Sequence, residues 1–338
     1  MRIKERDIRQ ASVWNIDASS YDCHALHTQA RNFVEGNCYI DIWIELIHTS
    51  GLDAYAFLPF TLASDFEGDQ WTFYKPSFDD LIYLYGINVQ ELYLWRSLPE
   101  QVATQLRLNK IVLLEVDSFY LPDTRDSDYQ QQHVKTTIGI ESIDVDSCTL
   151  GYFHNAGYYS LQGEDFRGIF HLENEGVPES LPPYAEIVKF DSIVHYPPEE
   201  IRQRSMQLAQ RYISALPTEN PISCFSQVIQ SDIEWLMEQG LDAYHRYAFG
   251  SLRQMGSCFE LTARYCRWLQ SDEAEPGLSE IATHFDDISL AAKTLILKGA
   301  RIVNKQKSKD LTTDLEDAAD HWDVAMSALQ KWIACRKI

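Results

Sequence analysis

The chain has 338 residues, 45% of them hydrophobic and 12% aromatic, which is enough for one large or two smaller folded domains and excludes disorder as its main state. Its net charge of −21 disfavours nucleic acid and anionic membranes as partners, because phosphate binding requires a cationic surface. The charged N-terminus lacks the apolar run of a signal peptide, and the seven scattered cysteines form no C-x-x-C pair. This pattern is typical of free thiols in a reducing cytosol, so we expect a cytoplasmic protein without a metal site or a cofactor.

The first predicted element that bears on function is a helix over residues 38–48. Asn37 precedes it and is a plausible N-cap. Asp41, Glu45 and His48 recur on one side of this helix, which could indicate a metal site. We favour instead the polar side of an amphipathic surface helix, in which Glu45 could still contact substrate.

Further along the chain, residues 111–116 form a mostly apolar run that predicts a buried strand ending at Asp117. Residues 134–143 then alternate between apolar and polar, and residues 148–153 follow a turn at 144–147. These two runs predict a β-hairpin.

The character of the sequence changes at Pro197 and Pro198. Beyond this point the apolar residues recur at helical spacing, with loops at 271–277 and 304–309. The predicted helices cover residues 201–216, 225–238, 248–269, 278–303 and 311–333. We therefore predict an α+β domain over residues 1–198 with a central antiparallel sheet, and an α-helical domain over residues 199–338.

Cys38 is the candidate nucleophile, because it occupies the first turn of its helix. Unpaired backbone N–H groups and the helix dipole favour a thiolate there. A buried, inert cysteine is the alternative at such a position, and it is the interpretation we favour for Cys258 and Cys266.

The hairpin supplies the partners of this nucleophile. His133 begins the first strand, and His154 and Asn155 stand at the end of the facing strand. A base at one strand end with an orienting side chain at the neighbouring end is the arrangement that a Cys-His-Asn triad needs. We expect Cys38 as nucleophile, His133 as base and Asn155, or else His154, as the orienting residue. This chain order is that of papain-like enzymes.

The sequence also resembles a bacterial family known as domain of unknown function 1839. The resemblance covers almost the whole chain, and it carries no established activity. The residues that carry it are NCYIDIWIELIH at 37–48, DFEGDQWTF at 65–73, LPDT at 121–124, HVKTTI at 133–138 and YFHNAGY at 152–158.

A more distant likeness suggests a reaction. Residues 115–122 (EVDSFYLP), followed by Tyr129, His133 and a hairpin, are similar to the papain-like acyltransferase of butirosin biosynthesis. That family moves an acyl group from a carrier-protein thioester to an amine, and its cysteine domain is likewise followed by a helical domain. The present chain has His154 and Asn155 where that family tends to have an aspartate after the second strand.

Other side chains are candidates for supporting roles. Asn37 and Asn32 could donate hydrogen bonds to an oxyanion. Asp65 and Glu67 lie on a loop before a strand predicted to begin at Trp71, and they could line the substrate cleft. With Asp69 they resemble a calcium loop only weakly, because the distal glutamate is missing.

The resemblance and the residue pattern together favour a cysteine-dependent acyltransferase, with an acyl or aminoacyl carrier protein as donor and a small-molecule amine as acceptor. A papain-like hydrolase (peptidase, amidase or thioesterase) would use the same triad, and a non-catalytic binding protein could keep the fold without the chemistry. All three alternatives remain open at the level of sequence.

Overall fold

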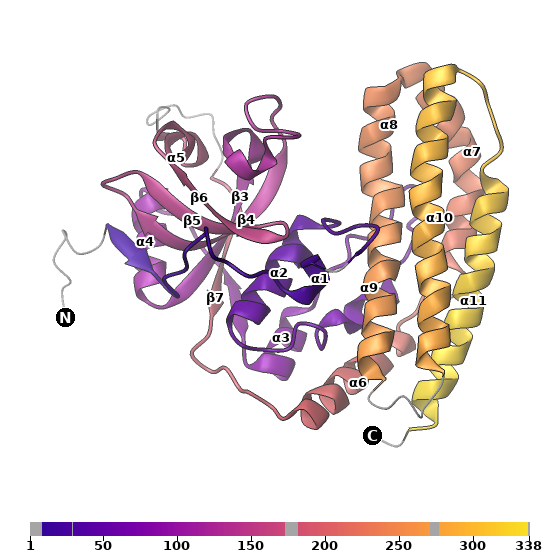
Figure 1. Cartoon of the computed structure of the whole chain (residues 1–338), viewed down its shortest axis with the longest axis horizontal. Helices are drawn as coiled ribbons and strands as arrows, with labels where there is room; N and C mark the ends of the chain where they lie inside the picture. Colours follow the sequence, from indigo (N-terminus) through magenta and orange to yellow (C-terminus); the bar gives the residue numbers. More distant parts are fainter. Residues whose placement is uncertain (1–8, 29, 173–181, 271–276, 337–338) are drawn as a thin grey trace. The chain divides into compact units, whose positions relative to one another are not determined.

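An antiparallel sheet of seven strands is the centre of the first structural unit, which comprises Met1–Thr28, Cys38–Leu52 and Leu81–His195. The computed structural model describes residues 9–28, 30–172, 182–270 and 277–336. Six strands follow the order β2-β7-β3-β4-β5-β6, and β1 pairs with β4 (Figure 1). The strands are β1 (Gln10–Ser12), β2 (Asn88–Glu91), β3 (Lys110–Asp117), β4 (Lys135–Asp144), β5 (Thr149–His154), β6 (Gly157–Gln162) and β7 (Ala185–Lys189).

The strands predicted over residues 111–116, 134–143 and 148–153 are confirmed. β4 and β5 form the expected hairpin, in which Gly139 faces Phe153 and a bulge separates Ile140 from Ser142. Asp117 is the last residue of β3, and it faces Lys135 at the start of β4. The α+β class is therefore confirmed, with the sheet antiparallel throughout its described pairings.

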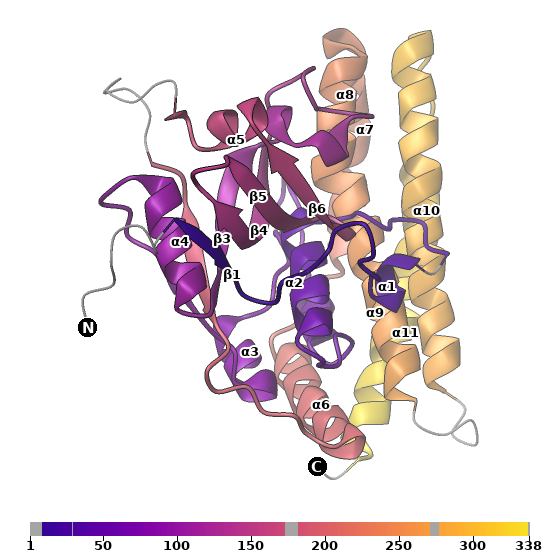
Figure 2. The ribbon, with the colours of Figure 1, turned by 60° about the vertical axis from the view of Figure 1, so that its left-hand side comes forward.

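Helices cover both faces of the sheet (Figure 2). One face packs apolar side chains such as Leu114 and Ile138 against α4 (Leu98–Arg107) and α5 (Glu164–Ile169). The other face carries α2 (Cys38–Thr49), which approaches the sheet so closely that a Cβ at Gly139 would lie 3.1 Å from Ile42 Cγ2. The remaining helical segments of this unit are α1 (Ala25–Thr28), most of α3 (Phe78–Tyr85), η3 (Ser118–Tyr120) and η4 (Pro122–Thr124).

The interpretation of α2 as an amphipathic surface helix is wrong. Every residue from Tyr39 to Ile47 is buried, including Asp41 and Glu45, which are 2% and 0% exposed. Charged side chains tolerate such burial only when they are paired. The partners come from the segment before the helix, which the sequence pattern did not identify.

Long helices make up most of the second unit, which comprises Gln29–Asn37, Asp53–Asp80 and Tyr196–Ile338. Within it α9, α10 and α11 run side by side (Figure 1). The helices are η2 (Leu58–Ala63), α6 (Pro198–Ser214), α7 (Pro221–Gln239), α8 (Leu241–Ala248), α9 (Gln254–Leu269), α10 (Leu278–Lys305) and α11 (Thr312–Ala334). None of the described helices is long and apolar enough to cross a membrane.

The five helices expected after Pro198 are confirmed as α6, α7, α9, α10 and α11, but α8 was not predicted, and the helix expected from residue 248 begins differently. There α8 ends, and a π-helical segment, Phe249–Arg253, connects it to α9. The loop predicted at 304–309 follows the end of α10 at Lys305. In the loop predicted at 271–277, residues 271–276 lie outside the described part of the chain.

Each unit comprises three separate segments of the chain, so the boundary between the units is not a single position at residue 198. Residues 29–37 and 53–80 belong to the helical unit, although they precede most of the sheet in sequence. Aromatic packing explains the second segment: the ring centroids of Phe66 and Trp71 lie 5.1 and 5.9 Å from that of Phe225 on α7. The strand expected at Trp71 is reduced to an isolated bridge with Phe66.

Candidate functional site

Cys38 is the first residue of α2, as the sequence predicted, and it is partly exposed. A first-turn position places it among the backbone N–H groups that have no acceptor within the helix. These groups and the helix dipole stabilise a negative charge, which is one way in which a protein activates a thiol.

Burial makes most other cysteines poor nucleophiles. It raises the pKa of Cys258 and Cys266 to about 12, and the thiols therefore stay protonated at neutral pH. The pKa of Cys23 is raised to about 11 by burial and by the charges of Glu45 and Asp22. Burial and Glu219 also raise the pKa of Cys224. These four cysteines are therefore controls for Cys38 rather than competitors.

His133 is held by Asp117, a residue that the sequence analysis had treated only as the end of a strand. The distance from His133 Nδ1 to Asp117 Oδ2 is 2.5 Å, and the ring of Phe119 stacks on the imidazole with centroids 4.4 Å apart. A carboxylate can only accept, so Nδ1 carries the proton, and in the neutral imidazole Nε2 is then the atom with the lone pair. The His133 side chain is 68% exposed, which leaves Nε2 accessible to a substrate or a nucleophile.

The His133–Asp117 pair lies on the face of the sheet that carries α2. Residues two apart on a strand share a face, as do residues that face each other on neighbouring strands. Gly139 points at α2, so Lys135 on the same strand and Asp117 opposite Lys135 are on that face too. A second ion pair, from Lys135 Nζ to Glu115 Oε1 at 2.6 Å, follows the same rule.

The expected contact between Cys38 and His133 is not formed in this structure. Among the described residues no hydrogen bond joins the Cys38 sulfur to either ring nitrogen of His133. Contacts between a nucleophile and its base are often long before substrate binds, and they shorten in the reacting complex.

The two side chains expected to orient His133 are placed elsewhere. His154 is 2% exposed, with Nδ1 2.6 Å from Asp123 Oδ2 and Nε2 2.9 Å from Thr136 Oγ1. Thr136 alternates with Lys135, so this cluster lies on the face opposite α2. Asn155 has a φ of +47° in the tight turn between β5 and β6, a conformation that asparagine tolerates better than most residues. Among the described residues no hydrogen bond joins either side chain to His133, whose partner is Asp117, so their orienting role stays a prediction.

His154 contacts the loop over residues 118–134, which carries His133. Asp123 on this loop accepts hydrogen bonds from Tyr152 Oη, at 2.5 Å, and from His154. Both donors belong to β5, so these bonds hold the loop against that strand. Ser118 Oγ donates to Asp128 Oδ2 at 2.9 Å, and Ser118 N donates to Val134 O at 2.9 Å. These bonds tie Ser118 to residues on either side of His133.

The segment before α2 pairs with the carboxylates of the helix. His27 Nδ1 hydrogen-bonds Glu45 Oε1, and His27 Nε2 lies 3.3 Å from Asp41 Oδ1. Tyr21 Oη and the backbone N–H of His24 also donate to Glu45, at 2.6 and 3.1 Å. Glu45 has no exposed surface in this structure, and the substrate contact that the sequence analysis allowed for it stays a prediction.

The two histidines of this segment have opposite pKa shifts. Burial alone would lower the pKa of His27, but the hydrogen bonds and charges of Asp41 and Glu45 outweigh it and raise the pKa to about 9. Burial and the neighbouring His48 and His27 lower the pKa of His24 to about 4, against the charge of Glu45. His27 is therefore a buried cation at neutral pH, while His24 is neutral.

His48 does not join this network through its ring nitrogens. Its Nε2 lies 3.2 Å from the carbonyl oxygen of Asp22, and its ring lies 5.2 Å from that of His24. Asp41 and Glu45 are instead paired with His27, which makes these positions of α2 a buried ion-pair cluster.

The remaining sequence candidates lie in the helical unit. The Asn37 side chain is buried and donates from Nδ2 to Tyr74 O at 3.3 Å. Asn32 N donates to Glu260 Oε1 at 2.6 Å, and its Oδ1 accepts from Lys293 at 3.3 Å. Their role as oxyanion donors stays a prediction.

Asp65 and Glu67, the proposed cleft residues, form a turn in the same unit. Asp65 Oδ1 accepts from the N–H of Phe66 at 2.7 Å, and Glu67 N donates to Gln70 O at 2.8 Å. These bonds account for the turn, and the contact of its acids with substrate also stays a prediction.

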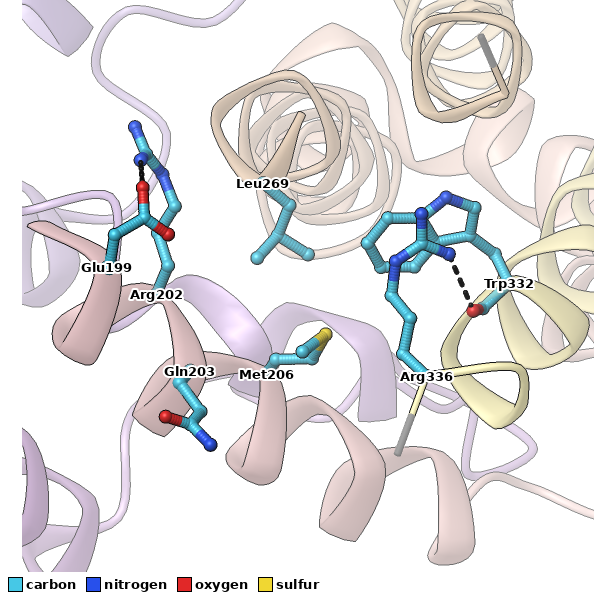
Figure 3. Close-up of a pocket in the computed structure, with 7 residues that line it drawn as sticks. All are labelled: Glu199, Arg202, Gln203, Met206, Leu269, Trp332 and Arg336. Carbon is cyan, nitrogen blue, oxygen red and sulfur yellow. Dashed lines mark hydrogen bonds and ion pairs between the residues drawn. The ribbon is translucent and has the colours of Figure 1, made fainter. Parts of the chain in front are cut away.

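A pocket of about 140 Å³ lies within the helical unit (Figure 3). Its arginines are already engaged: the Arg336 guanidinium stacks on Trp332, 3.4 Å from the ring centroid, and Arg202 pairs with Glu199 at 3.5 Å. The pocket is lined by Glu199, Arg202, Gln203, Met206, Leu269, Trp332 and Arg336. None of the residues predicted to be catalytic lines it, so it is not the candidate site.

Comparison with protein families accounts for nearly the whole chain. Residues 22–190 match the model described as the DUF1839 N-terminal domain, and residues 198–331 match the DUF1839 C-terminal domain. The search of curated proteins gave no match.

Proposed function

Because the chain belongs to the DUF1839 family, whose name records no activity, we propose a function from its own residues. The chain is a cysteine-dependent acyltransferase that moves an acyl or aminoacyl group from a carrier-protein thioester to an amine through an acyl-Cys38 intermediate. The observation that carries this proposal is the exposed His133–Asp117 pair on the sheet face that also holds α2.

In the first half of the reaction, Cys38 attacks the thioester carbonyl and His133 Nε2 takes up the thiol proton. The tetrahedral intermediate expels the carrier thiolate, which receives that proton from His133. Asp117 keeps Nδ1 protonated and stabilises the imidazolium that forms between these steps.

In the second half, an amine attacks the acyl-Cys38 carbonyl and passes a proton to His133 Nε2. The new amide bond forms as the Cys38 thiolate leaves. Water in place of the amine would give a hydrolase on the same residues, so the two functions differ in the acceptor and share the covalent intermediate.

The test is the intact mass of the protein after mixing with a panel of acyl- and aminoacyl-carrier thioesters without an acceptor. We expect a gain of one acyl group that disappears in Cys38→Ala and persists in Cys23→Ala and Cys148→Ala. An added amine should then discharge the adduct as an amide. If water discharges it equally fast, the hydrolase assignment replaces transfer, and if no thioester, ester or amide acylates the protein, covalent catalysis at Cys38 is contradicted.

A further inference from the structure

Two helices of the helical unit bring together a set of side chains that acyl transfer does not use. His284 and Asp287 lie one turn apart on α10, and His321 faces them from α11. One ligand atom from each residue falls within 4.8 Å of the other two. Among the described residues this is the group of three whose geometry suits a metal ion.

The contacts within the group are close. The Nδ1 atoms of His284 and His321 are 2.7 Å apart, and His321 Nδ1 is 3.8 Å from Asp287 Oδ2. In a tetrahedral zinc site with bonds of about 2.0–2.1 Å, neighbouring ligand atoms lie about 3.3 Å apart. Because the ligand atoms lie within 4.8 Å of one another, a shift of less than about one ångström in each side chain would place all three around one ion.

We propose that His284, His321 and Asp287 form a binding site for a divalent transition metal of the zinc class, which links α10 to α11. Two imidazoles and one carboxylate are ligands that zinc prefers, whereas calcium and magnesium favour oxygen ligands. The side chains of His321 and Asp287 are 35% and 46% exposed, so an ion can enter from solvent and water can complete its coordination.

A hydrogen bond between two neutral imidazoles is the competing explanation, since one Nδ1 can donate to the other. That explanation accounts for the histidines but gives Asp287 no part. It also requires no metal, so the two explanations differ in whether the chain binds zinc.

The same pair of helices offers a matched control. Lys298 Nζ on α10 contacts both carboxylate oxygens of Asp314 on α11 at 2.7 Å. Asp287→Asn and Asp314→Asn therefore each neutralise one aspartate that bonds across the two helices, and only the first removes a proposed metal ligand.

The experiment is calorimetric titration of the metal-stripped full-length chain with zinc sulfate, repeated with cobalt(II) to record its visible absorption. We expect one ion per chain and a higher melting temperature with zinc. Affinity should fall about tenfold or more in His284→Gln, His321→Gln and Asp287→Asn, because even outer residues of metal sites cost that much when they are replaced. Asp314→Asn should keep the wild-type affinity, and acid should weaken binding by protonating the imidazoles.

Circular dichroism of each variant separates loss of a ligand from loss of fold, and the glutamine substitutions keep the polar contact. The absence of saturable zinc binding to the folded wild type would overturn the proposal. Equal affinities for wild type and His321→Gln would overturn it as well.

Discussion

Two histidine–aspartate pairs belong to the same part of the sheet unit, and they differ in almost every physical respect. His154 and Asp123 are 2% and 3% exposed in their side chains, and both nitrogens of the histidine are bonded. His133 and Asp117 are 68% and 24% exposed, and one nitrogen of His133 has no hydrogen-bond partner among the described residues. A buried pair holds a structure together, whereas an exposed pair contributes little to stability. The exposed pair is therefore the one whose arrangement calls for a chemical explanation.

Equal effects of the two pairs on the free energy of unfolding would contradict this distinction between them. His154→Ala should lower the free energy of unfolding by about 4 kcal/mol, because it leaves the buried Asp123 carboxylate without its histidine partner and, among the described residues, with only the Tyr152 hydroxyl as a donor. His133→Ala should lower it by less than about 1 kcal/mol, the usual contribution of an exposed pair. Denaturant unfolding followed by circular dichroism measures both, and a larger loss in His133→Ala would contradict the assignment of roles.

A third histidine, His27, extends the comparison, because it is buried as a cation between the carboxylates of Asp41 and Glu45. Its folded pKa of about 9 lies above the usual value of 6.5. The folded state therefore binds the extra proton, so the stabilisation is complete below about pH 6.5 and is lost as pH rises through 9. We expect the wild type to lose about 3 kcal/mol more than His27→Gln between pH 6.5 and pH 10. Denaturant unfolding at each pH measures this difference, and parallel curves for the two proteins would contradict the charged state of His27.

The elements that local pattern specifies were predicted well from sequence. The hairpin of β4 and β5 follows from alternation and turn residues, and α6, α7, α9, α10 and α11 follow from helical spacing. The start of α2 at Cys38 follows from a helix pattern that begins just after Asn37, the predicted N-cap.

The features that distant parts of the chain decide were missed. The sequence pattern of α2 does not reveal that Tyr21 and His27 bury its carboxylates. Asp117 was overlooked because β3 and β4 are joined by a long loop, so the pairing of Asp117 with Lys135 is not a hairpin register. His284 and His321 lie 37 residues apart, and only the packing of α10 on α11 brings them together.

The central claim is that His133, oriented by Asp117, is the base that deprotonates Cys38. The most direct measurement is the rate at which iodoacetamide alkylates Cys38 at pH 7, followed by peptide mass spectrometry, with Cys148 in the same digest as an internal reference. His133→Ala and Asp117→Asn should each slow alkylation of Cys38 by about tenfold, because the thiolate loses its base. Asn155→Ala, the matched control, should leave the rate unchanged. Equal alkylation rates of Cys38 in wild type, His133→Ala and Asp117→Asn would contradict the account.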